Sequence, residues 1–286
     1  MGKITELRIL LPLCLGIGLA VLFYPTLRDV AEICWNYEDY SHGLLLPFIT
    51  GYLIWCRREE IAERLPVDNA SAVGFSKLGA FLYAAGLIGY LLGRAGDSFF
   101  ACWIFLFPTL IGVLLLLFGA RLVAPIAGPL LINYMAKPVP DSLLPKLLNP
   151  FQTFAAAVSA KVLELFQVPV HAMGNVIEIP GMRLLVEQAC SGMRSLISLI
   201  TVALIVLALM ELNWLGSVLI LAIAVITAVI LNIVRVALTG LLAYFVDPAT
   251  ATGFFHSFAG MVVFLLGLAI LFFFGRQLEP RFRRIK

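Results

Sequence analysis

The sequence predicts an all-α polytopic membrane protein with about eight transmembrane helices, an external amphipathic helix and a short β-hairpin. Of its 286 residues, 62% are hydrophobic and only 13% are charged, and the mean hydropathy is +1.01. Soluble domains have about 45 to 50% apolar and roughly 25% charged residues, so a soluble globule could not bury this much apolar surface. We therefore expect a single integral membrane domain over residues 1–286.

The expected helices are apolar runs that approach the roughly 20 residues needed to cross a bilayer. Five lie in the first half of the chain, at about 9–25, 43–56, 75–93, 98–118 and 122–136. Three more follow, at about 194–211, 214–243 and 254–275. The second and fifth runs are short and contain prolines, so the count of eight is approximate.

Basic residues indicate the orientation, because Lys and Arg are enriched beside the cytoplasmic ends of membrane helices. Two groups stand out, one in the loop between the second and third runs and one in the C-terminal tail: Arg57, Arg58, Arg64 and Lys77, and Arg276, Arg281, Arg283, Arg284 and Lys286. Eight crossings with an internal amino terminus place both groups inside. They place an acidic group outside: Asp29, Glu32, Glu38 and Asp39.

The polar stretch at about 137–193 is then external, as an interfacial or re-entrant region. It begins with the proline-rich KPVPDSLLP and continues with FQTFAAAVSAKVLELF, whose apolar face suits a helix in the membrane interface. NVIEIPGMRLLVEQ follows, with two short strand-like runs around Pro180 and Gly181, and is typical of a β-hairpin. This hairpin leads directly to Cys190.

Cys190 lies in ACSGMRSL, at the expected start of the sixth helix. A helix amino terminus favours thiolate over thiol, and Arg194, four residues on, adds a positive charge on the same face. Ser191 is the rival nucleophile. Cys14, Cys34, Cys56 and Cys102 are interpreted as small apolar packing residues. Because the cysteines show no CxxC spacing, we expect no metal site and no disulfide framework, and we expect no cofactor.

Arg235 interrupts the apolar run AVITAVILNIVRVALTG, where only Asn232, three residues earlier on the same face, is comparably polar. An arginine inside a membrane span costs at least about 2.5 to 3.5 kcal/mol, so it needs a buried partner or a function. The acids that could pair with it lie at the predicted membrane edges or in the hairpin: Glu211, Asp247, Glu178 and Glu187.

His256, in GFFHSFAG, begins the eighth run on the external side, and His42, in YSHG, has a similar position at the second run. A histidine at a helix end is often only an interfacial residue. From Trp214 to Arg235 a helix rises roughly 32 Å, close to the thickness of the hydrocarbon core. We therefore expect Cys190, Arg235 and His256 at the same outer boundary.

A thiolate, a cation and an imidazole at one depth are the groups needed for acyl transfer. The thiolate attacks a carbonyl, the cation holds the developing oxyanion, and the imidazole protonates the leaving amine. The residues therefore favour hydrolysis or transpeptidation of a peptide bond at the external face.

The chain resembles the exosortase/archaeosortase family over about residues 35 to 275. The resemblance rests on ACSGMRSL, NIVRV and FFHSFAG in the family's order, supported by WNYEDYSHG and GNVIEIPG. It implies that Cys190 is the nucleophile, that Arg235 and His256 complete the catalytic set, and that Arg194 supports the cysteine motif. Gln188 departs from the pattern, because an acid would be expected before the Ala-Cys pair.

By resemblance, the substrates are exported proteins of the PEP-CTERM type, with a Pro-Glu-Pro motif, a transmembrane helix and a basic cluster. The implied location is the bacterial inner membrane, with the active site toward the periplasm, an unidentified acceptor, and a role linked to exopolysaccharide. The net charge of +3 gives no indication of nucleic-acid binding. The alternatives are a transporter, in which Arg235 and the external histidines line a path, or a structural subunit for exopolysaccharide export.

Overall fold

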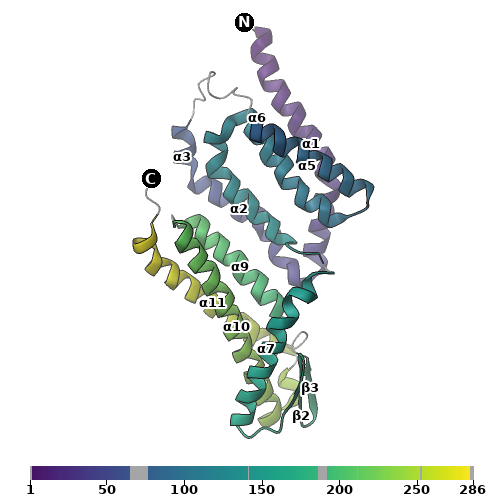
Figure 1. The fold of residues 1–286 in the computed structure, drawn as a ribbon, viewed down its shortest axis with the longest axis vertical. Helices are drawn as coiled ribbons and strands as arrows, with labels where there is room; N and C mark the ends of the chain where they lie inside the picture. Colours follow the sequence, from purple (N-terminus) through teal and green to yellow (C-terminus); the bar gives the residue numbers. More distant parts are fainter. Residues whose placement is uncertain are drawn as a thin grey trace. The chain divides into compact units, whose positions relative to one another are not determined.

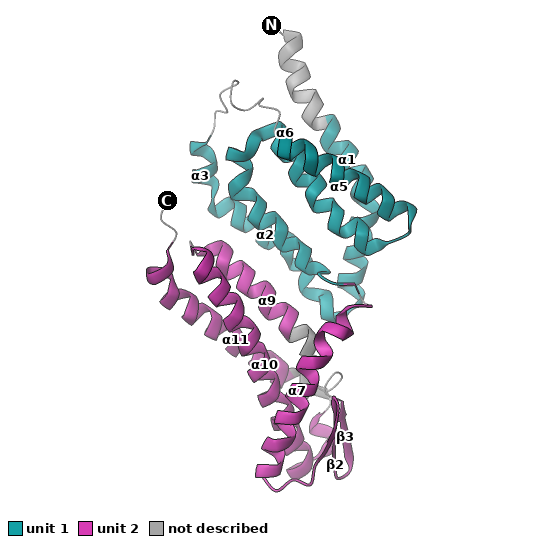
Figure 2. Ribbon diagram, in the orientation of Figure 1, with its two compact units in different colours: residues 1–139 teal, residues 140–286 magenta. Residues whose placement is uncertain are grey.

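The computed structural model describes residues 2–64, 77–140, 142–185, 192–210, 212–251 and 253–283. Within these ranges, the side chains of residues 2–13, 192–195 and 253–257 are not described. The chain forms two compact units, residues 1–139 and 140–286, which are considered separately (Figure 2).

Long apolar helices dominate both units (Figure 1). Within the described ranges, five helices are long and apolar enough to cross a membrane: Cys14–Asn36, Lys77–Ala95, Phe99–Ala136, Trp214–Phe245 and Phe258–Phe282. A shorter apolar helix covers Leu196–Leu209. Each of these helices contains or overlaps an expected run, so the helical membrane class holds, while the count of eight crossings remains a prediction.

In the first unit, α1 (Gly2–Asn36) is longer than the expected run at 9–25. It continues through the acidic Asp29 and Glu32, two of the residues expected outside the membrane. Glu32 forms a 2.7 Å ion pair with Arg28 one turn earlier, a spacing that supports a helix. The following segment is a 3₁₀ helix, η1 (Glu38–Leu45), which leads into α2 (Leu46–Cys56) and α3 (Arg58–Glu63).

Helix α6 (Phe99–Ile132) contains the fourth and fifth expected runs and packs closely on α5 (Lys77–Ala95). A straight helix of 34 residues would rise about 51 Å, well beyond the roughly 30 Å hydrocarbon core. Gly119, at φ 74° and ψ 164°, interrupts the helical geometry between the two runs. Since this backbone conformation suits glycine, Gly119 divides α6 where the sequence predicted a connection. The 3₁₀ helix η2 (Asn133–Ala136) follows.

Two arginines satisfy carbonyls that the prolines of α6 leave without a helical donor. Pro125 has no N–H for the carbonyl of Arg121, and Arg64 Nη1 donates to that oxygen at 2.5 Å. Pro129 has the same effect on the carbonyl of Pro125, which accepts a 2.6 Å hydrogen bond from Arg57 Nη1. The prolines thus create acceptors that fix the end of α2 and α3 to α6.

The second unit contains α7 (Leu144–Leu165), α9 (Gly192–Leu209), α10 (Trp214–Phe245) and α11 (Gly253–Phe282). Helix α10 packs against each of the other three, and α9 also contacts α11. The short η3 (Pro248–Ala251) connects α10 to α11. Helix α7 confirms the expected amphipathic helix, but its buried face, with Ala155, Ala156 and Ser159, packs on α10. Ser159 Oγ donates to the carbonyl of Ile233 at 3.2 Å.

The expected hairpin is present as β2 (Val176–Ile179) and β3 (Met182–Leu185), with Ile179 opposite Met182. Gly181 has φ 80°, which suits the turn. An additional strand, β1 (His171–Met173), pairs antiparallel with β2 and was not predicted. Ile177 and Leu184 pack with Leu163 of α7 and Val236 of α10, so the sheet rests on the carboxyl-terminal half of α10.

Candidate functional site

Arg235 is buried in α10, with 6% of its surface exposed. Its guanidinium lies directly against the backbone of α11 at Gly260. A Cβ atom at residue 260 would lie 3.0 Å from Arg235 Nη2 and 3.2 Å from Cζ. The guanidinium therefore has its present position because residue 260 has no side chain, and a methyl group there would have to displace it by a few tenths of an ångström.

Gly260 is the last residue of the FFHSFAG motif, and His256 lies four residues earlier in α11. Residues four apart on a helix occupy the same face, one turn apart. The helix therefore places His256 one turn from the residue that contacts the guanidinium of Arg235. The side chain of His256 is outside the described part of the structure.

The first turn of α9 lies at the same level along the helix axes as Gly260 and the guanidinium of Arg235. A Cβ at Gly267 would lie 2.8 Å from Leu199 Cδ1, so these two residues of the parallel helices α9 and α11 face each other. Gly192 and Gly260 each lie seven residues before this contact, about 10 Å along their helices. Gly192, Gly260 and the guanidinium of Arg235 thus lie at nearly one level, at the end of the bundle where α9 begins.

Cys190 and Ser191 lie outside the described residues, and Arg194 is described only as part of the first turn of α9. Helix α9 is described from Gly192, which is two residues after Cys190 in the sequence. The nucleophilic role of Cys190 and the supporting roles of Ser191 and Arg194 remain predictions.

Two of the acids considered as partners for Arg235 are occupied elsewhere. Glu178 accepts a 2.6 Å hydrogen bond from Arg183 Nε across the hairpin, where Arg183 is well exposed and Glu178 is partly exposed. Asp247 Oδ1 accepts from the backbone N–H of Ala249 at 2.8 Å, at the start of η3. Glu187 and Glu211 lie outside the described residues. Glu178 and Asp247 thus have local structural roles.

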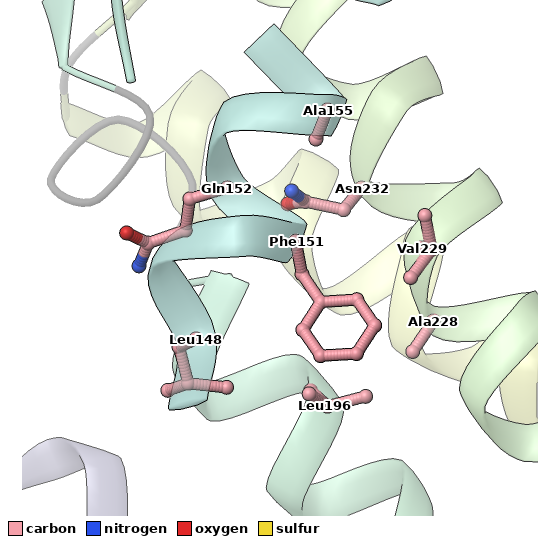
Figure 3. A pocket seen from close by; sticks show the side chains of 8 residues that line it. All are labelled: Leu148, Phe151, Gln152, Ala155, Leu196, Ala228, Val229 and Asn232. Atoms are coloured by element: carbon pink, nitrogen blue, oxygen red, sulfur yellow. The ribbon is translucent and has the colours of Figure 1, made fainter. Parts of the chain in front are cut away.

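Asn232 lines a pocket in the second unit, one turn before Arg235 on the same face of α10. Its side chain is 9% exposed, and among the described residues its Oδ1 atom has no hydrogen-bond partner. The pocket contains about 340 Å³ of space, part of it open to the surroundings. It is lined by Leu148, Phe151, Gln152 and Ala155 of α7, Leu196 of α9, and Ala228, Val229 and Asn232 of α10 (Figure 3).

His42 belongs to the first unit, where it connects η1 to η2. Its Nε2 atom lies 3.2 Å from the carbonyl oxygen of Met135, and burial lowers the pKa of the imidazole below its ordinary value. The next residue, Gly43, packs so closely that a Cβ there would lie 2.9 Å from that of Ala136. The structure thus gives His42 a packing role in the first unit, and a role in catalysis remains a prediction.

Sequence reasoning missed two residues of structural interest. Gly260 is the last residue of FFHSFAG, and its position four residues after His256 is the sequence signal that could have identified it. Lys137 is 5% exposed, and its ammonium lies 4.0 Å from the centroid of the Tyr40 ring, a cation–π contact. No local pattern distinguishes Lys137 from a lysine in an external loop.

The remaining cysteines that were interpreted as packing residues divide into two kinds. Cys34 and Cys102 are each 2% exposed, and Cys102 Sγ lies 3.8 Å from the carbonyl of Tyr90. Cys14 and Cys56 are exposed on apolar helices. The packing interpretation therefore holds for Cys34 and Cys102.

A family model described as transmembrane exosortase (Exosortase_EpsH) matches residues 34–273, which is most of the chain. No curated protein and no solved structure matches the chain.

Proposed function

Because the chain belongs to the transmembrane exosortase family, we propose that it is a thiol-dependent membrane peptidase or transpeptidase. Its substrates are exported proteins with a C-terminal sorting signal of the PEP-CTERM type, and the signal is cleaved at the external face of the bacterial inner membrane. The observation that carries the proposal is the buried guanidinium of Arg235, which lies against Gly260 one helical turn from His256.

In the proposed reaction, the Cys190 thiolate attacks the carbonyl carbon of the scissile peptide bond, and a carbon–sulfur bond forms. The negative charge moves to the carbonyl oxygen, where the cation of Arg235 stabilises it. His256 donates a proton to the amide nitrogen as the carbon–nitrogen bond breaks, which releases the signal helix as an amine and leaves a thioester. Water or an acceptor amine then attacks the thioester, His256 takes up the proton that this nucleophile loses, and Cys190 leaves as the thiolate.

Burial strengthens the proposed role of Arg235. A charge held in a site that excludes water interacts more strongly with a developing oxyanion than an exposed charge does. The guanidinium also stays protonated under all ordinary conditions. The proposed role of Cys190 is supported by its place in the sequence, two residues before the described start of α9, since backbone N–H groups at a helix start favour a thiolate.

The test is to co-express the protein with a substrate that has a Pro-Glu-Pro motif, a transmembrane helix and a basic cluster. We expect Cys190→Ala, Arg235→Ala and His256→Ala each to lower the processing rate by at least about 10³-fold, the scale seen for residues of a catalytic set. The measurement is the conversion of substrate from the full-length to the shortened form.

Arg183→Ala is the matched control, because Arg183 is an exposed arginine whose ion pair with Glu178 contributes little. It should leave processing within about twofold of the unchanged protein. Full processing by Cys190→Ala would reject the thiol mechanism, and loss only in Ser191→Ala would assign the nucleophile to Ser191. If none of these substitutions changes processing of the substrate but the same variants fail to export polysaccharide, the transporter or structural alternative is favoured.

A further inference from the structure

The pocket between α7, α9 and α10 has a chemical composition that the catalytic set does not explain. Most of its lining is apolar, yet Asn232 places an amide at its wall, and more than nine-tenths of that side chain is buried. In Figure 3 this amide extends from α10 toward α7, whereas the amide of Gln152 points away from it. Among the described residues, none donates to Asn232 Oδ1.

A buried acceptor without a donor costs about 1 to 3 kcal/mol, so the site favours an occupant that supplies an N–H or O–H group. A lipid chain has no such group. A water molecule normally needs two to four polar partners, but the only other polar side chain among the lining residues is Gln152, whose amide points away from Asn232 (Figure 3). An amino-acid residue of a peptide supplies both an apolar side chain and a backbone N–H.

The position of the pocket relative to Arg235 indicates which part of a peptide reaches it. Asn232 precedes Arg235 by three residues on the same helix face, about 4.5 Å closer to Trp214 along the axis. The predicted topology places Trp214 inside, so the pocket lies deeper in the membrane than Arg235. A sorting signal that spans the membrane with its basic end inside has its helix on this deeper side of the scissile bond.

We propose that this pocket binds one apolar residue of the substrate, on the signal-helix side of the scissile bond, and that Asn232 Oδ1 accepts a hydrogen bond from the substrate backbone. The proposal rests on the proposed function, since it assigns part of the same substrate to a subsite. The first turn of a helix has N–H groups without intrahelical acceptors. Asn232 supplies such an acceptor where the bilayer supplies none.

The first experiment measures contact without catalysis. Val229, which lines the pocket, is replaced by cysteine in a full-length Cys190→Ala protein whose other cysteines are alanine. The substrate has a single cysteine at successive positions after its Pro-Glu-Pro motif, and membrane vesicles are oxidised with copper phenanthroline. We expect a disulfide with one or two adjacent substrate positions, formed at least 10-fold more than with Ile230→Cys, the next residue on α10, which is 53% exposed.

The second experiment measures specificity in the otherwise unchanged protein. Val229→Phe reduces the space in the pocket, and it should lower the processing of a substrate with Leu at the crosslinked position by at least 10-fold. Processing of the matched substrate with Ala there should fall less than threefold, which also shows that the variant folds. Asn232→Leu should raise KM about 10-fold with little change in kcat.

Equal crosslinking at Ile230→Cys, no crosslinking at Val229→Cys, or equal effects of Val229→Phe on both substrates would overturn the pocket assignment. A pocket that holds only water gives this last pattern. These outcomes are distinct from failure of the proposed function, which is full processing by Cys190→Ala. Crosslinking at Val229→Cys together with such processing would retain the subsite and reject the thiol mechanism.

Discussion

At the scale of single residues, the contact between Gly260 and Arg235 explains a glycine that sequence patterns leave unexplained. The guanidinium lies so close to residue 260 that a methyl group there would have to displace it by a few tenths of an ångström. Helix interiors disfavour glycine by about 1 kcal/mol relative to alanine, so its presence indicates a requirement for space. The space at residue 260 lets the guanidinium of Arg235 lie against the backbone of α11.

Gly260→Ala should therefore lower processing by about 10- to 100-fold, because a displacement of about 1 Å at a catalytic group can cost this much. In an Arg235→Ala background the same change should have little further effect, since the two residues act through one contact. The measurement is the processing rate for each of the four proteins, normalised to the amount in the membrane.

Gly267→Ala is the control for packing alone, because Gly267 is equally close to Leu199 but lies two turns from Gly260. It should lower the amount of folded protein more than the normalised rate. If Gly260→Ala is as active as the unchanged protein, or if its effect persists in full without Arg235, Gly260 does not position the guanidinium.

At the scale of elements, two arginines next to α3 donate hydrogen bonds to carbonyls that two prolines of α6 leave without a helical donor. The positive-inside pattern predicted that Arg57 and Arg64 mark the cytoplasmic edge. The structure adds that both donate to carbonyls released by Pro125 and Pro129. A charge that is predicted to mark the cytoplasmic edge thus also completes the hydrogen bonding of a neighbouring helix.

Arg57→Ala should destabilise the protein by about 1.5 to 3 kcal/mol, the range for hydrogen bonds that involve a charged group. The measurement is the denaturation midpoint of the detergent-purified protein. Adding Pro129→Ala should recover part of this loss, because residue 129 regains an N–H that can donate to the carbonyl of Pro125.

Arg58→Ala is the matched control, since Arg58 is more than half exposed and lies over the Trp55 ring at 4.3 Å. Its replacement should change the stability by less than about 1 kcal/mol. An equal loss in Arg57→Ala and Arg58→Ala, with no recovery from Pro129→Ala, would reject the role of the released carbonyl.

At the scale of the whole molecule, the number of crossings depends on how α6 is counted. If α6 crosses the membrane once as a single helix, α5 and α6 together make two crossings between α3 and the β-sheet. If α6 is divided at Gly119 and crosses twice, there are three crossings. An odd number places Glu63 and Ala172 on opposite sides of the membrane, and an even number places them on the same side.

We expect opposite sides. In a protein without its own cysteines, Ala172→Cys should react with a membrane-impermeant maleimide in cells with a permeabilised outer membrane. Glu63→Cys should react only after the inner membrane is also opened. Both positions are exposed, so burial does not limit the reaction. Labelling of both cysteines under the same condition would contradict the division of α6 and the predicted topology.

Local physics explains which features the sequence predicted. Apolar runs fixed the positions of the long helices, and alternation around Pro180 and Gly181 predicted the β2–β3 hairpin correctly. The strand His171–Met173 was missed because its three residues are exposed and show no apolar alternation. Helix α1 extends past the expected run at 9–25, because an ion pair one turn apart supports a helix through charged residues.

The sequence by itself determined the membrane class, the family resemblance and the residues Cys190, Arg235 and His256 as candidates, since each depends on composition or on local motifs. Only the tertiary structure decided that Arg235 lies against Gly260, that α7 packs on α10, and that Asn232 lines a pocket. These contacts join residues on different helices, and their geometry depends on helix register and on the space that small residues leave, which no single segment encodes.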